Sequence, residues 1–149
     1  MTQPITFTVY GRPQQMGSKR AFVRGNRAII TDDNSEKRKQ WANAVSTAAA
    51  EAMDRRKLID GPVRVSVGFH FRRPKLHYGT GRNAAQLKGS APRYHAQTPD
   101  VDKLIRCLLD ALTGIVFRDD CLVHVMTVQR NWTEQQERAV VSITPEVGL

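Results

Sequence analysis

The chain has 149 residues and a formal net charge of +9; 40% of its residues are hydrophobic and 25% are charged. This composition excludes general disorder and fits a single domain over residues 1–149 with a hydrophobic core. No apolar run approaches the roughly 18 residues of a membrane-spanning helix, and residues 1–10 lack the pattern of a signal peptide. We therefore expect a cytoplasmic protein that does not enter a membrane.

The positive charge and its distribution indicate a polyanionic partner. So large a positive charge favours nucleic acid over the alternative of a basic protein without such a partner. Between Asp60 and Asp100 there is no acidic residue, while seven arginines and lysines and three of the four histidines fall there. Tyr78 and Tyr94 lie among them, where they could stack on exposed bases. A solvated flexible loop would have the same composition, and the two interpretations are compatible.

The first part of the chain has the pattern of a strand, a hairpin and a long helix. Residues 5–10 (ITFTVY) alternate between apolar and polar positions, which predicts a strand. Residues 21–30 have the pattern of a β-hairpin. A helix is expected from near Asp33, because Asp33 and Glu36 resemble a capping box, and it should stop by Gly61.

The second part alternates strands with one strongly patterned helix. Residues 63–71 (VRVSVGFHF) predict a strand, and residues 74–97 predict a long loop that is either functional or disordered. A helix is expected over residues 99–112, with Thr98 at its N-cap. Residues 122–132 and 138–144 predict two further strands. We therefore expect an α/β fold with a mixed sheet of about five strands and two main helices.

Acidic residues are concentrated around this second helix. Only 14 residues of the chain are acidic, yet five of them lie between Asp100 and Asp120. If the segment after the helix doubles back along it, four carboxylates converge: Asp100, Asp102, Asp119 and Asp120. Such a cluster repels itself unless a cation binds, and an all-oxygen ligand set favours Mg²⁺, for which Mn²⁺ could substitute.

Each acidic pair also has a structural explanation. Aspartates in a first turn stabilise a helix through its dipole, and an Asp-Asp turn before a strand is common. Asp110 is the weakest candidate for a metal ligand, because Arg106 lies one turn before it. The acidic and basic segments together nevertheless favour a nuclease, which needs both a metal held by carboxylates and cations for the phosphate backbone.

Other enzyme classes find no support in the sequence. There is no G-x-S-x-G motif and no arrangement of Ser, His and Asp that would indicate a protein nucleophile. There is also no G-x-x-x-x-G-K-[ST] loop, so no nucleotide cofactor is expected.

Three separate segments resemble the RusA family of Holliday junction resolvases, in its phage-type branch. Residues 99–104 (PDVDKL) are similar to the family's P-D-x-D-N-L, and residues 109–114 (LDALTG) to its L-D-A-L. Asp119 and Asp120 with Val123 are similar to its D-D-x-x-V. The N-terminal segment and the first helix also fit, so the resemblance covers most of the chain.

This resemblance implies an α/β homodimer that cuts four-way DNA junctions by paired nicks with magnesium. The family's catalytic aspartates fall on Asp100, Asp102 and Asp120, with Asp119 beside them as a further metal ligand. A family lysine falls on Arg106, which keeps the positive charge but cannot donate a proton near neutral pH. The family's asparagine falls on Lys103.

The sequence therefore predicts a set of roles on branched DNA. Arg106 and Lys103 would neutralise the scissile phosphate, and the junction arms would be guided by five further cations: Lys19, Arg20, Arg72, Arg73 and Lys75. Two alternatives remain open. The chain could be a basic DNA-binding module without catalysis, or a nuclease for flaps, forks and other branched DNA.

Overall fold

The structure is a computed structural model that describes residues 3–17, 19–32 and 35–147. Between residues 19 and 32 it describes the side chains of residues 23 and 25–28 only. The elements of the main body are β1 (Ile5–Tyr10), α1 (Ser35–Met53), β4 (Val63–Arg72), α2 (Val101–Leu112), β5 (Val123–Thr133) and β6 (Arg138–Pro145). The expected mixed α/β fold with two main helices is confirmed.

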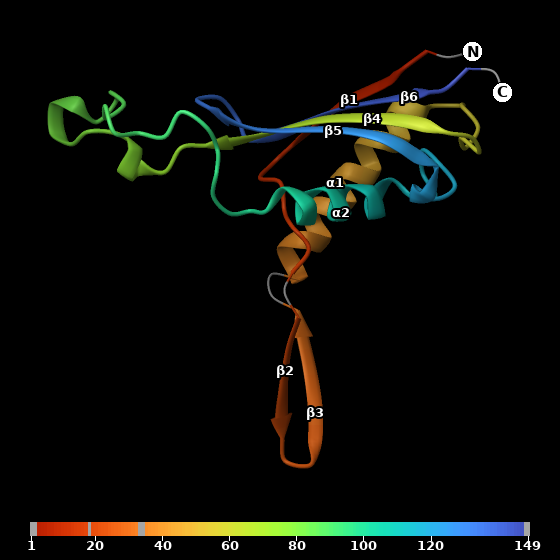
Figure 1. The fold of residues 1–149 in the computed structure, drawn as a ribbon, viewed down its shortest axis with the longest axis horizontal. Coiled ribbons are helices and arrows are strands. Elements are labelled where there is room, and N and C mark those ends of the chain that lie inside the picture. Colours follow the sequence, from red (N-terminus) through yellow and green to blue (C-terminus); the bar gives the residue numbers. More distant parts are fainter. Residues whose placement is uncertain (1–2, 18, 33–34, 148–149) are drawn as a thin grey trace.

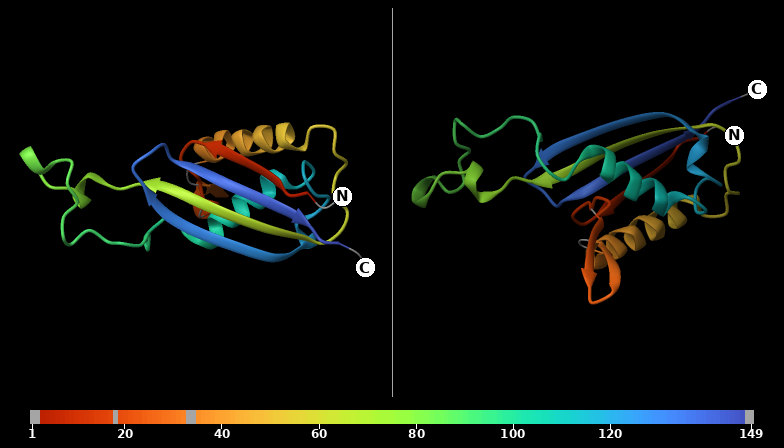
Figure 2. Two further views of the ribbon diagram at one scale, coloured as in Figure 1. Left: turned by 90° about the horizontal axis from the view of Figure 1, so that it is seen from above. Right: turned by 60° about the horizontal axis from the view of Figure 1, so that its bottom comes forward.

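A four-stranded sheet with both helices on one face forms this body (Figures 1 and 2). The strand order is β1-β6-β4-β5; β4 and β5 are parallel, and the other neighbouring pairs are antiparallel. The alternation in residues 63–71 buries Val65, Val67 and Phe69 against the helices and turns Arg64 and Ser66 toward solvent. Because β5 is the last strand in this order, it lies at an edge of the sheet.

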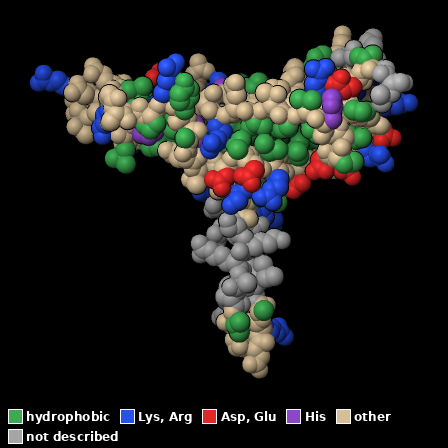
Figure 3. Space-filling model, viewed as in Figure 1, with side chains coloured by type: hydrophobic (Ala, Val, Ile, Leu, Met, Phe, Trp, Pro, Cys, Tyr) green, Lys and Arg blue, Asp and Glu red, His purple; other side chains and the backbone are tan. Residues whose placement is uncertain are grey.

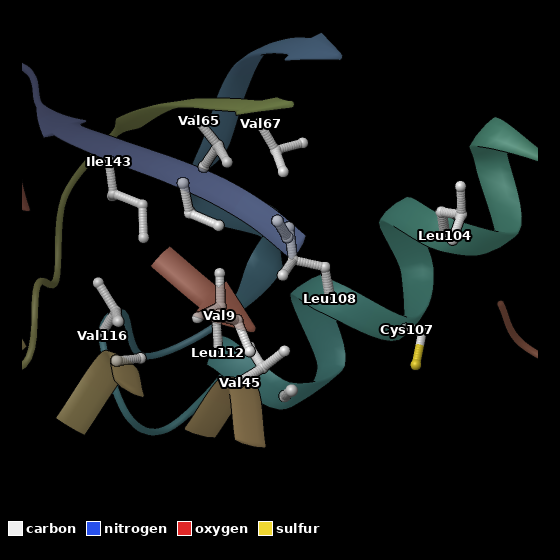
Figure 4. Close-up of a cluster of buried hydrophobic side chains, with 14 of the residues drawn as sticks. Val9, Val45, Val65, Val67, Leu104, Cys107, Leu108, Leu112, Val116 and Ile143 are labelled. Carbon is white, nitrogen blue, oxygen red and sulfur yellow. The ribbon is translucent and has the colours of Figure 1, made fainter. Parts of the chain in front are cut away.

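The core lies between the helices and the sheet (Figure 4). Leu104, Leu108 and Leu112 recur on one stripe of α2 and are fully buried. They meet Val45 of α1 and Ile143 of β6, both of which are also fully buried. This packing fixes the rotation of α2, so its opposite side, with Asp102 and Arg106, is exposed.

The start of α2 differs from the expectation. The helix begins at Val101 with Asp100 at the N-cap, two residues after the N-cap that Thr98 was expected to provide. Asp100 has extended backbone angles (φ −73°, ψ 140°), and its backbone N–H donates to the side chain of Gln15. That long-range hydrogen bond satisfies a donor at the helix start without a side-chain cap. The expected capping residue of α1, Asp33, lies outside the described residues.

Two segments project from the body (Figure 1). The hairpin of β2 (Lys19–Arg24) and β3 (Arg27–Asp32) extends from the helix side and forms a sheet of its own, which the prediction of one sheet did not foresee. Residues 73–99, here called the basic arm, extend past the end of β4. The arm is held by its own backbone hydrogen bonds, such as Gly79 N–H to Gln86 O (2.9 Å) and Lys88 N–H to His77 O (2.9 Å). Neither described helix has the length and apolar character to cross a membrane.

Candidate metal centre and nucleic-acid interface

Asp100 and Asp102 lie at the start of α2 and both are exposed. Asp100 Oδ2 is 3.7 Å from Lys103 Nζ, and Asp102 Oδ2 is 3.8 Å from an Nη of Arg106. The Asp100 carboxylate makes no capping hydrogen bond to the helix. Capping therefore does not explain Asp100, and each carboxylate has a cation one turn along the helix.

The segment that leads into Asp100 is held by two residues that the sequence did not single out. Arg130 on β5 donates through Nη1 to the carbonyl oxygens of Gln97 (2.7 Å) and Pro99 (3.0 Å). Gln15 Oε1 accepts the backbone N–H of Asp100 at 2.8 Å. These bonds fix the backbone around Asp100 from two sides. No local pattern marks either partner, because each is distant in sequence.

Asp120 begins the short 3₁₀ turn Asp120–Leu122 that precedes β5, and Asp119 is the N-cap residue of this turn. Asp119 Oδ1 accepts the backbone N–H of Cys121 at 3.0 Å, and this bond lowers the pKa of Asp119. The pKa of Asp120 is raised, first by partial desolvation and then by the carboxylates of Asp119 and Asp110. This turn is therefore an anionic patch that a cation would stabilise.

The structure does not unite the two acidic groups within one chain. Asp120 lies near Asp110, toward the end of α2, whereas Asp102 lies in its first turn. The helix advances about 12 Å between Asp102 and Asp110. No three His, Cys, Asp or Glu residues of the described part of the chain come together as a metal site. The condition for convergence, that the segment after the helix doubles back along it before Asp119, is therefore not met within one chain.

Hydrogen bonds at the end of α2 explain this difference. Gly114, with φ of 82°, donates its N–H to Phe117 O at 2.8 Å, which closes a tight turn directly after the helix. Arg118 N–H donates to Ile59 O at 3.0 Å and holds the turn beside the segment before β4. The chain then returns along α2 as β5 (Figure 1), so the acidic turn stays at the far end of the helix from Asp100.

An apolar surface separates the two acidic groups (Figure 3). Val101, Ile105 and Leu109 follow one another at one-turn spacing on α2, and none of them is fully buried. On β5, Val125 has 40% of its surface exposed. Acidic side chains lie along the lower border of this surface in Figure 3. We call the α2 and β5 residues of this surface the α2–β5 face.

The cations expected to guide DNA differ in their surroundings. Arg72 Nε donates to Gln135 O at 3.1 Å, and Arg73 Nη1 donates to Pro92 O at 2.5 Å. The Arg73 guanidinium also lies 5.3 Å from the Trp132 ring centre, so Arg73 tethers the basic arm to β5. Lys75 is exposed and pairs with no carboxylate of the described residues. The side chains of Lys19 and Arg20 lie outside the described residues.

Aromatic packing at the base of the basic arm gives it a fixed origin. His95 is buried, and its ring centre lies 4.4 Å from that of Trp132 and 4.7 Å from that of Phe71. Burial, followed by the charge of Arg130, lowers the pKa of His95, so the ring stays neutral at neutral pH. The arm therefore leaves the body in a defined direction, directly before Asp100 in the chain.

The chain is similar to a known protein family and to a protein from Bacillus subtilis. Residues 11–144 match the family described as Endodeoxyribonuclease RusA, and the chain belongs to this family. A relative from Bacillus subtilis (strain 168), named Uncharacterized protein YqaN, is 27% identical over 131 residues. That alignment covers 88% of this chain and 89% of the relative. The family is one of endodeoxyribonucleases, so the fold and the sequence place the chain in this class of protein.

Proposed function

We propose that this chain is a magnesium-dependent endonuclease that resolves four-way DNA junctions by paired nicks. The observation that carries the proposal is the pair of exposed acidic groups, at the start of α2 and before β5, on a chain of net charge +9 in an endodeoxyribonuclease family. Purely structural aspartates would not need to be concentrated in two exposed groups on a chain with so large a positive charge.

The donor atoms fit the proposed metal. Asp100, Asp102, Asp119 and Asp120 offer only carboxylate oxygens, which suit hard cations such as Mg²⁺. The pKa of Asp120 is raised by partial desolvation and then by the carboxylates of Asp119 and Asp110, and a cation would relieve the repulsion among these carboxylates. When bound, Mg²⁺ supplies positive charge at the scissile phosphate and lowers the pKa of water, so no protein nucleophile is needed.

Lys103 and Arg106 would bind the scissile phosphate and neutralise its charge. Each now lies beside an aspartate at the start of α2, at 3.7 Å and 3.8 Å respectively. Exposed ion pairs of this kind contribute about 0–1 kcal/mol, so exchanging the carboxylate for a phosphate costs little. Arg106 holds the phosphate by charge and hydrogen bonds and does not act as a proton donor.

A homodimer through the α2–β5 face would complete the metal site. A twofold axis that crosses α2 places the partner's α2 antiparallel to α2 of the first protomer. The exposed edge of β5 can likewise pair antiparallel with β5 of the partner. The acidic turn of one protomer then faces Asp100 and Asp102 of its partner across the apolar surface. Two equivalent sites result, which suits a four-way junction with approximate twofold symmetry.

Metal dependence and substrate choice test the proposal together. Labelled four-way junction, fork and linear duplex are each incubated with Mg²⁺ or with a chelator. We expect paired nicks in the junction with Mg²⁺, and no nicking when the metal is removed. Binding without nicking under every condition would favour a non-catalytic module, and equal cutting of fork and junction would favour a broader branched-DNA nuclease.

The basic arm should contribute a salt-dependent part of DNA binding. Arg73→Ala with Lys75→Ala is expected to reduce the slope of log K against log salt by up to about two units. Lys75→Ala alone should reduce it by about one unit, because Lys75 is exposed and Arg73 also tethers the arm. Fluorescence anisotropy over a salt series measures the slope. A slope equal to that of the wild type would show that the basic arm does not contact DNA.

A further inference from the structure

The β2–β3 hairpin is not needed to build the body. Its two strands pair with each other along their whole length, from Lys19 opposite Asp32 to Arg24 opposite Arg27. None of its described side chains belongs to the hydrophobic core, and Val23 has 74% of its surface exposed. An isolated two-stranded hairpin is at best marginally stable in water. Such an element is expected to have its function in contact with a partner.

The charge on the hairpin identifies the chemistry of that partner. Its sequence contains Lys19, Arg20, Arg24 and Arg27 against a single acidic residue, Asp32. At the tip, Arg24 and Arg27 are direct cross-strand partners around the turn at Gly25, whose φ is 66°. Like charges opposite each other destabilise a hairpin, whereas an anion bound at the tip would stabilise it. A second copy of this chain, itself strongly basic, is a poor match.

The dimensions of the hairpin suit a groove of duplex DNA. Six residues per strand give a length of about 20 Å, which exceeds the roughly 8.5 Å depth of the major groove. A two-stranded β-ribbon fits within the groove's width of about 12 Å. Double-stranded arms are what a four-way junction presents on every side of its crossover.

The base of the hairpin is attached to the helix that carries the candidate metal ligands. Just before the hairpin, Met16 N–H donates to Lys103 O at 3.1 Å, and Gln15 holds the backbone N–H of Asp100. The hairpin and the basic arm extend from the body in different directions (Figure 1). DNA held by the hairpin would therefore lie on the same side of the molecule as Asp100 and Asp102.

We propose that the β2–β3 hairpin is a ribbon that enters a groove of one junction arm, with the positive charges of its tip against the phosphates. This inference rests on the proposed function, because it assigns the hairpin to the same substrate. The hairpin grips duplex DNA and fixes the distance from the gripped arm to the candidate metal ligands.

The first test removes the charge at the tip. Arg24→Ala with Arg27→Ala is compared with Arg55→Ala with Lys57→Ala, which removes the same charge from the exposed segment beyond the other end of α1. Anisotropy titrations of four-way junction and of linear duplex are run over a salt series. The tip variant should lower the salt slope by about two units and weaken binding about tenfold, while the control stays at the wild-type slope. Arg24→Lys with Arg27→Lys should restore most of the slope.

A second measurement asks what the tip touches. p-Benzoylphenylalanine is incorporated at Asn26, which is exposed at the turn, and the full-length protein is irradiated with labelled junction. Cross-linking to DNA supports the proposal. Cross-linking to a second protein chain overturns the proposal, and so do equal salt slopes for the tip variant and the control. In either case, metal-dependent junction cleavage by the wild type would show that the proposed function survives. If the wild type neither binds nor cuts the junction, both proposals are wrong.

Discussion

Asp102→Asn should abolish junction cleavage while leaving junction binding at least as tight as in the wild type. The substitution removes one carboxylate charge from the proposed metal site, and we expect a loss of about three orders of magnitude, as when a charge-stabilising group is removed from an active site. Binding persists because the change removes a negative charge beside the phosphate backbone. Single-turnover cleavage and anisotropy on the same junction measure the two effects separately.

The position of Asp102 makes this variant a clean probe. Its side chain is 71% exposed, and its contact with Arg106 is a surface ion pair, so the free energy of unfolding should change little. Glu51→Gln, at an exposed position of α1, is the matched control and should cut at the wild-type rate. Cleavage by Asp102→Asn at the wild-type rate would show that Asp102 is not part of the proposed metal site.

Local pattern was enough to predict most of the body. The strict alternation of residues 63–71 gave β4, and the leucines spaced along residues 104–112 gave α2 and its buried stripe. The pairing of Asp102 with Arg106 follows from helical spacing alone. These features depend on periodicity within one element, which a single sequence displays directly.

Long-range hydrogen bonds determine what local pattern could not predict. Gln15 is 85 residues from Asp100, and Arg130 is 31 residues from Pro99, so nothing near Asp100 marks either partner. The bond from Arg118 to Ile59 holds the acidic turn away from the start of α2. Spacing alone left the convergence of the carboxylates conditional on a return of the chain along α2, because the direction of the turn after α2 decides where Asp120 lies.

The separation of the acidic groups gives the most specific prediction about the dimer. Asp102→Asn and Asp120→Asn should each be inactive as homodimers, yet a heterodimer of the two should recover nicking. If each site combines Asp102 of one protomer with Asp120 of its partner, both changes fall in one site and the other site is intact. Differently tagged chains, co-expressed and purified on both tags, give the heterodimer free of homodimers.

The product of the heterodimer distinguishes the two possible arrangements. With one intact site, the rate of first-strand nicking should be about half that of the wild type, and products should be single nicks instead of paired ones. A site built within one chain would leave both sites of the heterodimer with one damaged ligand, and no nicking would recover. Lack of recovery would therefore contradict the dimer proposed on the α2–β5 face, while the cleavage assay on the wild type would still decide whether the chain is a nuclease.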